Sequence, residues 1–148
     1  MDLTEKISAI MTANVHSVSK NDELFKALQL IRNHKIRHLP VVEGDQIVGI
    51  LSSTDLNRLT FGGLFSSHES ESESEDEGIL QMLSISQVMT SKVRTVSADS
   101  TIKEVAEIFA KEGFHALPVA DREGKLSGIV TTTDVIRFIL KKHAAWVF

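Results

Sequence analysis

The sequence contains no cysteine and no tyrosine, and it has only two prolines in 148 residues. Without cysteine, neither a disulfide framework nor a thiolate metal site can form, and a cytoplasmic location is the simplest expectation. No hydrophobic run approaches the length of a membrane-spanning helix, and the N-terminus lacks the basic and apolar regions of a signal peptide. We therefore expect neither secretion nor a membrane partner.

The formal net charge is -4, but six of the 20 acidic residues lie in one stretch of alternating serine and glutamate, residues 66–78. The rest of the chain holds 14 acids against 16 lysines and arginines, which is close to neutral and favours no nucleic-acid partner. The acidic stretch has no apolar surface to bury, so we predict a disordered linker over residues 66–80. A divalent-cation sink and a phosphorylation tract are the alternatives for this stretch.

Sequence motifs of enzymes are also missing. There is no G-x-S-x-G elbow, no H-E-x-x-H, no P-loop and no G-x-G-x-x-G. We therefore expect no enzymatic activity, no catalytic residues and no cofactor. His34 and His38 are four residues apart, but Pro40 argues against a continuous helix through both, so we predict no metal site.

What the chain does contain is a tandem repeat. Residues 85–96 match residues 7–18 at an offset of 78, and the offset becomes 79 at Gly128 and Asp134, which match Gly49 and Asp55. The first copy indicates helical turns at 3–10, a strand at 15–18, a helix ending near 34, a hairpin of strands 39–42 and 47–51, and a helix that begins near 53 and ends before 62. The second copy repeats this order, up to a helix over 135–143.

These patterns predict an α/β (α+β) fold of two β-α-β-β-α repeats, one in residues 1–65 and one in residues 81–148. Each repeat has about 60 residues, near the lower limit for a self-sufficient core. Helices cover one face of each small sheet, and the other face needs a partner. We expect the two repeats to pack sheet to sheet about a pseudo-twofold axis, with pockets in the clefts between them.

Each repeat carries a glycine, an apolar run, hydroxyl residues and an aspartate at the start of a helix: Gly49 to Asp55 and Gly128 to Asp134. Such a corner offers hydroxyls, a carboxylate and the unpaired backbone N–H groups of a helix N-terminus, which together suit the ribose and phosphate of a nucleotide. Helix capping alone is the alternative explanation, because Ser, Thr and Asp are common at helix starts.

The repeated motifs resemble those of the CBS (cystathionine β-synthase) domain, here as a free-standing tandem pair, or Bateman module. The resemblance rests on Val88-Met89-Thr90, on His115 to Val119 and on Gly128 to Asp134, with the matching motifs of the first repeat. It implies regulatory binding of an adenine nucleotide (AMP, ADP or ATP), or alternatively of S-adenosylmethionine, in the clefts between the repeats.

The resemblance also implies the roles of individual residues. The aspartates contact the ribose, the neighbouring hydroxyls face ribose or phosphate, the residue after the glycine packs on adenine, and the first strand lends backbone contacts. A basic pair of the opposite repeat meets the phosphate. These expectations fall on Asp134, Thr133, Thr131, Ile129, Thr95, Arg37 and His38 for one site, and on Asp55, Thr54, Ser52, Ile50, Ser17 and His115 for the other. The first repeat has the basic pair Arg37-His38, whereas the second has His115 followed by an alanine and no arginine. Because a guanidinium binds a phosphate well, we expect one strong site, which combines Asp134 with Arg37.

A ligand-free dimerising scaffold is the alternative function. The helix at 135–143 and the apolar tail at 144–148 suggest core capping or a subunit contact. The resemblance implies a homodimer, and a regulatory module implies an effector protein that the sequence does not name.

Overall fold

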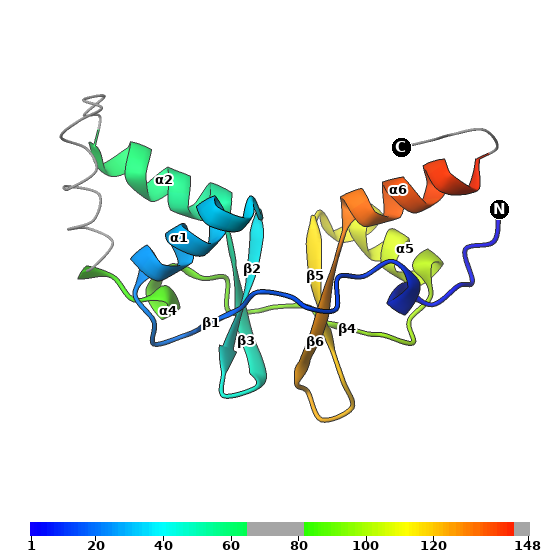
Figure 1. Cartoon of the computed structure of the whole chain (residues 1–148), viewed down its shortest axis with the longest axis horizontal. Helices are drawn as coiled ribbons and strands as arrows, with labels where there is room; N and C mark the ends of the chain where they lie inside the picture. The colour runs from blue at the N-terminus through cyan, green and yellow to red at the C-terminus, as the bar shows by residue number, and fades with distance from the viewer. Residues whose placement is uncertain (65–81, 144–148) are drawn as a thin grey trace. The chain divides into compact units, whose positions relative to one another are not determined.

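The computed structural model describes residues 1–64 and 82–143. It shows a mixed α/β fold with two three-stranded sheets, in the strand orders β1-β2-β3 and β4-β5-β6, which confirms the predicted fold class (Figure 1). The predicted linker at 66–80 and the apolar tail at 144–148 lie outside the described residues. Among the helices of residues 1–64 and 82–143, none combines the length and the hydropathy of a membrane-spanning segment.

The chain divides into two compact units. Unit 2 covers His16–Val93, and its sheet joins β1 to β2 in parallel and β2 to β3 in an antiparallel hairpin. Gly44 turns this hairpin with a φ of 63°, a conformation that glycine adopts without strain. The elements of unit 2 are β1 (Val18–Ser19), α1 (Leu24–His34), β2 (His38–Glu43), β3 (Gln46–Ser52), α2 (Ser53–Leu64) and α4 (Ile85–Val88).

Unit 1 consists of Met1–Val15 and Arg94–Phe148 and repeats the same topology. Its register is also the same, because Gly128 lies opposite Val119 as Gly49 lies opposite Val41. The elements of unit 1 are the 3-10 turn η1 (Ile7–Ala9), β4 (Val96–Ser97), α5 (Ile102–Glu112), β5 (Ala116–Ala120), β6 (Leu126–Thr131) and α6 (Thr132–Lys142).

The observed elements confirm the predicted hairpins and the helix that ends at His34, and they correct three boundaries. The helical turns expected at 3–10 shrink to the short turn η1, and the strand expected at 15–18 begins only at Val18. Helix α2 continues through Gly62 and Gly63 to Leu64, where we predicted a stop. A glycine in a helix costs about 1 kcal/mol relative to alanine, and such a propensity is a weak prior that context overrides.

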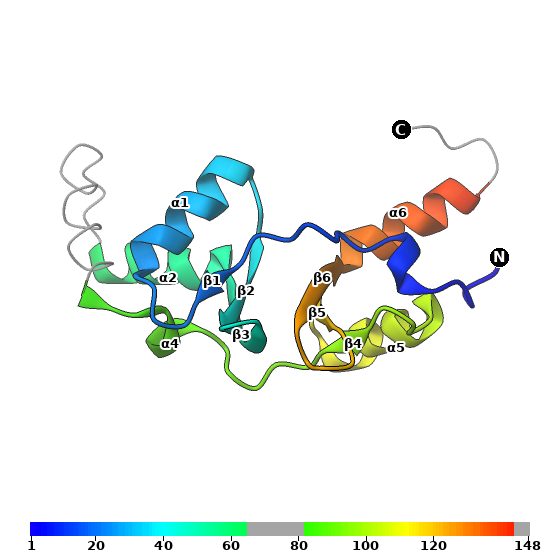
Figure 2. The same cartoon turned by 60° about the horizontal axis from the view of Figure 1, so that its bottom comes forward.

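The compact units are not the sequence repeats, because the two repeats exchange their first segments. Ile7 of the first repeat donates its N–H to the Ser100 carbonyl (2.8 Å), and Lys6 forms an isolated antiparallel β-bridge with Thr101. In the same way, Ile85 of the second repeat donates to the Asp22 carbonyl (3.2 Å). Figures 1 and 2 show the N-terminal segment beside α5 and α4 beside α1. Each unit therefore contains residues from both repeats.

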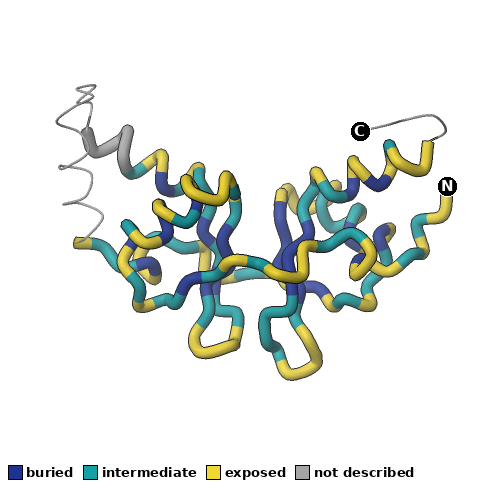
Figure 3. Tube along the Cα trace, in the orientation of Figure 1, coloured by how far each residue is buried: buried dark blue, intermediate teal, exposed yellow. Residues whose placement is uncertain are grey.

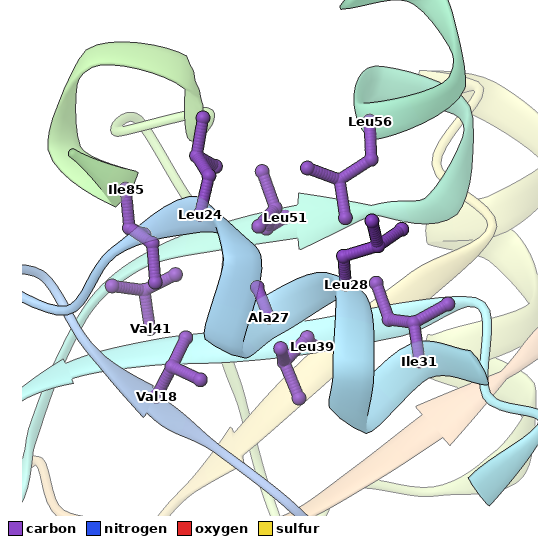
Figure 4. Close-up of a cluster of buried hydrophobic side chains, with 10 residues drawn as sticks. All are labelled: Val18, Leu24, Ala27, Leu28, Ile31, Leu39, Val41, Leu51, Leu56 and Ile85. Atoms are coloured by element: carbon purple, nitrogen blue, oxygen red, sulfur yellow. The ribbon is translucent and has the colours of Figure 1, made fainter. Parts of the chain in front are cut away.

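The exchanged segments contribute to the cores. Ile85, on α4, is fully buried among side chains of α1 and the sheet of unit 2 (Figure 4). Ile7 is fully buried in the matching cluster of unit 1. Figure 3 shows buried positions concentrated along the strands and on the inner sides of the helices. Fully burying an isoleucine side chain contributes about 1.5–3 kcal/mol, so the exchange is part of what stabilises each unit.

Asp22 stabilises the turn between β1 and α1, against which α4 packs. Partial burial raises the pKa of Asp22, but the N–H of Ser19 (2.9 Å from Oδ2) and the ammonium of Lys26 (3.1 Å) outweigh burial and leave the pKa below its usual value. The carboxylate is therefore ionised at neutral pH and stabilises the turn between β1 and α1. The backbone carbonyl of Asp22, in the same turn, accepts the hydrogen bond from the Ile85 N–H.

Candidate functional site

The aspartate predicted to bind ribose in the second repeat lies where β6 meets α6. Its Oδ2 accepts a hydrogen bond from the Thr131 N–H (2.9 Å), and the Asp134 N–H donates to Thr131 Oγ1 (3.1 Å). The two residues thus form a reciprocal capping box at the start of α6. We call residues 129–134 the β6–α6 corner.

The first repeat builds the same arrangement where β3 meets α2. The Ser52 N–H donates to Asp55 Oδ2 (3.1 Å), and the Asp55 N–H donates to Ser52 Oγ (3.1 Å). We call residues 50–55 the β3–α2 corner. Both aspartates therefore have the capping role that the sequence offered as the alternative explanation.

The backbone N–H groups of the two corners are less available than the sequence suggested. The Thr132 N–H donates to the His115 carbonyl (3.0 Å), and the Ser53 N–H donates to the Arg37 carbonyl (2.8 Å). The amides of Asp134 and Asp55 are bonded as well, to their capping partners. These four amides are not open for a phosphate, whereas the N–H groups of Thr133 and Thr54 have no acceptor among the described residues, so the expectation of unpaired N–H groups holds for one of these first-turn amides in each corner.

Capping leaves part of each aspartate available. In the described part of the chain, Asp134 Oδ1 and Asp55 Oδ1 have no hydrogen-bond donor, and both residues are only partly buried. A carboxylate oxygen can accept hydrogen bonds from hydroxyl groups, and it repels an anion. The carboxylate of each corner is therefore suited to a polyol such as a ribose rather than to a phosphate.

The structure places the other predicted residues around the corners of their own units. Thr133 and Thr54 are exposed on the first turns of α6 and α2, Ile129 is buried with 7% of its surface exposed, and Ile50 is partly buried. His115 is exposed just before β5. In unit 2, His38 pairs with Ser52 across the sheet, and the exposed Arg37 contacts Ser53 through its backbone. Arg37 and His38 thus adjoin the corner of their own repeat.

Thr95 and Ser17 directly precede β4 and β1, whereas the sequence predicted them on the first strand of each repeat. Thr95 is exposed, and it lines a cleft of about 500 Å³ that runs between the β4 segment and α5. None of the other predicted site residues lines this cleft, whose rim carries the ion pair of Arg94 with Glu112 (3.2 Å). The cleft is therefore separate from the capping box of the β6–α6 corner.

Two further residues, Thr12 and Thr90, contact the two corners and were not predicted from the sequence. Thr12 exchanges two backbone hydrogen bonds with Ile129 (2.9 and 3.0 Å), and Thr90 exchanges two with Ile50 (2.9 and 3.0 Å). The segment Met11-Thr12 lies so close to β6 that a Cβ on Gly128 would be 2.8 Å from the Thr12 carbonyl oxygen. We call Met11-Thr12 and the equivalent Met89-Thr90 the crossing segments. The recurrence of Met-Thr and of the motif glycine at matching offsets was the available signal.

The ring of His34 lies against another histidine of unit 2. Its ring stacks on that of His16 at a centroid distance of 3.9 Å and an interplanar angle of 22°. The residues that the structure describes contain no group of three or more metal-ligating side chains placed to hold an ion.

Comparison with known proteins shows which family has this combination of fold and motifs. The family model described as the CBS domain matches residues 7–61 and 85–141. The chain therefore belongs to the CBS domain family, with two copies of the domain.

Among curated proteins, the chain is 29% identical to the uncharacterised protein MJ0188 of Methanocaldococcus jannaschii, over 95% of this chain and 46% of that protein. It is 30% identical to a homoserine O-acetyltransferase of Methanococcus vannielii, over 93% of this chain and 25% of the enzyme. It is 27% identical to a CBS domain-containing protein of Dictyostelium discoideum, over 91% of each chain. The chain thus spans less than half of the first two relatives.

Solved structures agree on the fold. MJ1225 of Methanocaldococcus jannaschii superposes with a TM-score of 0.77 at 26% identity, over 94% of this chain and 49% of that one. CBSX2, crystallised in complex with AMP, has a TM-score of 0.73 at 27% identity, over 92% of this chain and 96% of that one. CBSX2 from Arabidopsis thaliana has a TM-score of 0.76 at 25% identity, over 92% of this chain and 94% of that one.

Proposed function

We propose that the chain is a regulatory module that binds an adenine nucleotide, with the β6–α6 corner as its principal ribose site. The observation that carries the proposal is the partly buried Asp134, whose Oδ2 is fixed by the Thr131 amide while Oδ1 has no donor in the described part of the chain. The AMP complex of CBSX2, which matches most of this chain at 27% identity, supports the choice of ligand class.

In this proposal Asp134 Oδ1 accepts hydrogen bonds from the ribose hydroxyls. Ile129 lies two residues before Thr131 on the same strand and packs on the adenine. Thr131 and Thr133 add hydroxyl contacts, and Thr95 adds a backbone contact. The capping box holds Asp134 in place before ligand arrives, which reduces the entropy lost on binding.

The phosphate contact is assigned to Arg37 and His38, an assignment that rests on the family resemblance. A guanidinium forms bidentate hydrogen bonds with a phosphate, whereas an alanine side chain has no donor. The second repeat has His115 followed by Ala116 at the matching positions. We therefore propose that the second ribose site, formed by Asp55 with Ser52, Thr54, Ile50 and Ser17, has the lower affinity for nucleotides.

Thermal unfolding of the full chain with AMP, ADP, ATP, S-adenosylmethionine, NAD or no ligand tests the proposal. A ligand at about 100 times its dissociation constant stabilises a protein by about 2.7 kcal/mol, which raises the Tm of a chain of this size by several degrees. We expect one of the adenine nucleotides to give the largest shift. If S-adenosylmethionine gives the largest rise in Tm, that compound and not a nucleotide is the ligand. The same Tm with every compound and without ligand would contradict the proposal.

We also propose that the module is a homodimer. Two large apolar side chains of α6 are exposed, Ile136 with 54% and Ile139 with 40% of its surface. Exposed apolar side chains on one helix face favour a subunit contact. Light scattering of the purified chain is expected to give twice the monomer mass, and the Ile136→Glu, Ile139→Glu double variant is expected to give the monomer mass. A wild-type monomer would contradict this part of the proposal.

The remaining parts of the proposal concern the setting of the module. We propose that it acts in the cytoplasm, without an enzymatic activity or cofactor of its own, and that it passes nucleotide occupancy to an effector protein. A ligand can do this only if it binds two arrangements of the module with different affinity.

A further inference from the structure

The two methionines next to the crossing threonines occupy equivalent positions in the two units. Met11 Sδ lies 3.1 Å from the point where a Cβ on Gly128 would stand, and Met89 Sδ lies 2.5 Å from the corresponding point at Gly49. Each sulfur therefore fills the space above a strand glycine. Each side chain also packs against the core of its own unit.

These side chains combine access with tight packing. Met11 and Met89 are partly buried, so solvent reaches them, yet their sulfurs touch the backbone surface of β6 and β3. The next residue in each case, Thr12 or Thr90, holds the exchanged segment on the strand by two backbone hydrogen bonds. A change in the shape or polarity of the methionine thus acts directly on the segment that crosses the corner.

We propose that Met11 and Met89 are a pair of oxidation sites for hydroperoxides. The thioether sulfur attacks the terminal peroxide oxygen and the O–O bond breaks. The proton of that oxygen passes to the other oxygen, which leaves as water from hydrogen peroxide or as an alcohol from an organic hydroperoxide. The sulfur is oxidised by two electrons to a sulfoxide, and the peroxide is reduced by the same two electrons. The product is polar and carries an extra oxygen in a position that packs against glycine.

Oxidation therefore releases the crossing segments from β6 and β3. The sulfoxide oxygen loses hydration if it stays in the packed position, and it has no room beside the strand, so the segment moves away. The backbone hydrogen bonds between Thr12 and Ile129, and between Thr90 and Ile50, open as a result. A further consequence, which rests on the proposed function, is weaker nucleotide binding at the β6–α6 corner.

The test treats the full chain with hydrogen peroxide and follows each methionine by peptide mass spectrometry and each crossing by amide hydrogen exchange. Met1 and Met82 are internal controls, since they expose 67% and 84% of their surface. We expect oxidation at Met11 and Met89 to accelerate exchange at the amides of Thr12, Ile129, Ile50 and Thr90 about tenfold or more. Reduction by a methionine sulfoxide reductase is expected to restore the original exchange rates.

Leucine variants assign the effect to each sulfur. A swap of methionine for leucine nearly conserves volume and removes the oxidisable atom. Met11→Leu is expected to abolish the response at Thr12 and Ile129 while the response at Ile50 and Thr90 persists, and Met89→Leu is expected to do the reverse. Exchange rates that stay unchanged after Met11 and Met89 are oxidised would overturn the proposal. So would the same acceleration in the double leucine variant, and so would full oxidation of Met1 and Met82 with none at Met11 or Met89. None of these readouts requires a nucleotide.

Discussion

The variant Gly128→Ala is expected to unfold at a Tm several degrees below that of the wild type. A Cβ at residue 128 would lie 2.8 Å from the Thr12 carbonyl oxygen, which is a backbone atom and cannot rotate away. The same oxygen accepts the Ile129 N–H at 3.0 Å, so moving it breaks the pairing that holds the exchanged segment on β6. Overpacking of this kind costs about 1–3 kcal/mol.

The sign of this effect separates the account from its alternative. At a position without steric conflict, replacing glycine by alanine stabilises a protein by about 0.4–1 kcal/mol, because the unfolded chain loses freedom. A Gly128→Ala chain with a Tm equal to or above the wild type would show that Thr12 does not pack on β6. Gly49→Ala is a useful comparison, because its nearest neighbour is the flexible Met89 side chain at 2.5 Å. Adding Met89→Ala is expected to recover part of the stability lost in Gly49→Ala.

The second large effect is expected for Asp134→Ala, which should lose the nucleotide-induced rise in Tm. The substitution removes the oxygen assigned to the ribose, and it also removes the acceptor for the Thr131 N–H. Loss of a helix cap costs about 1 kcal/mol, so the unliganded chain should be slightly destabilised as well. Thermal unfolding with and without the nucleotide measures both effects in one experiment.

Two control variants distinguish the ribose contact from the cap. Asp134→Asn retains an oxygen for the Thr131 amide but replaces the second acceptor by a donor, so it should keep the unliganded Tm and lose the ligand response. Asp55→Ala removes the matching cap of α2, whose Ser52 N–H lies 3.1 Å from the carboxylate, and should keep most of the ligand response. If both Asp134 variants keep the full nucleotide-induced rise in Tm, Asp134 caps the helix and does not bind the ribose.

The fold of each repeat was largely predictable from the sequence, because apolar periodicity and turn residues act locally. The helix ending at His34 and the hairpin turned by Gly44 depend on such local signals. The exchange of segments was not predictable in this way. The sequence repeat shows that Ile7 and Ile85 occupy equivalent positions. It does not show that Ile7 is buried against the sheet of the second repeat and Ile85 against the sheet of the first.

The candidate site was predictable to the same extent. Spacing placed Thr131 and Asp134 together, since residues three apart meet at a helix start. The use of the Thr132 amide by the His115 carbonyl depends on the pairing of β5 with β6, which the motif itself does not encode. The pairing of Ile129 with Thr12 joins residues more than a hundred positions apart, and no local pattern reports it.

Calorimetric titration of the full chain with AMP tests the central claim most directly, and ADP, ATP and S-adenosylmethionine are titrated in parallel. We expect saturable binding of an adenine nucleotide with a dissociation constant below about 1 mM, which corresponds to a binding free energy of about -4 kcal/mol. We also expect one strong site per chain and the loss of that site in Asp134→Asn. Absence of saturable binding for every compound, or strong binding that Asp134→Asn leaves unchanged, would contradict it.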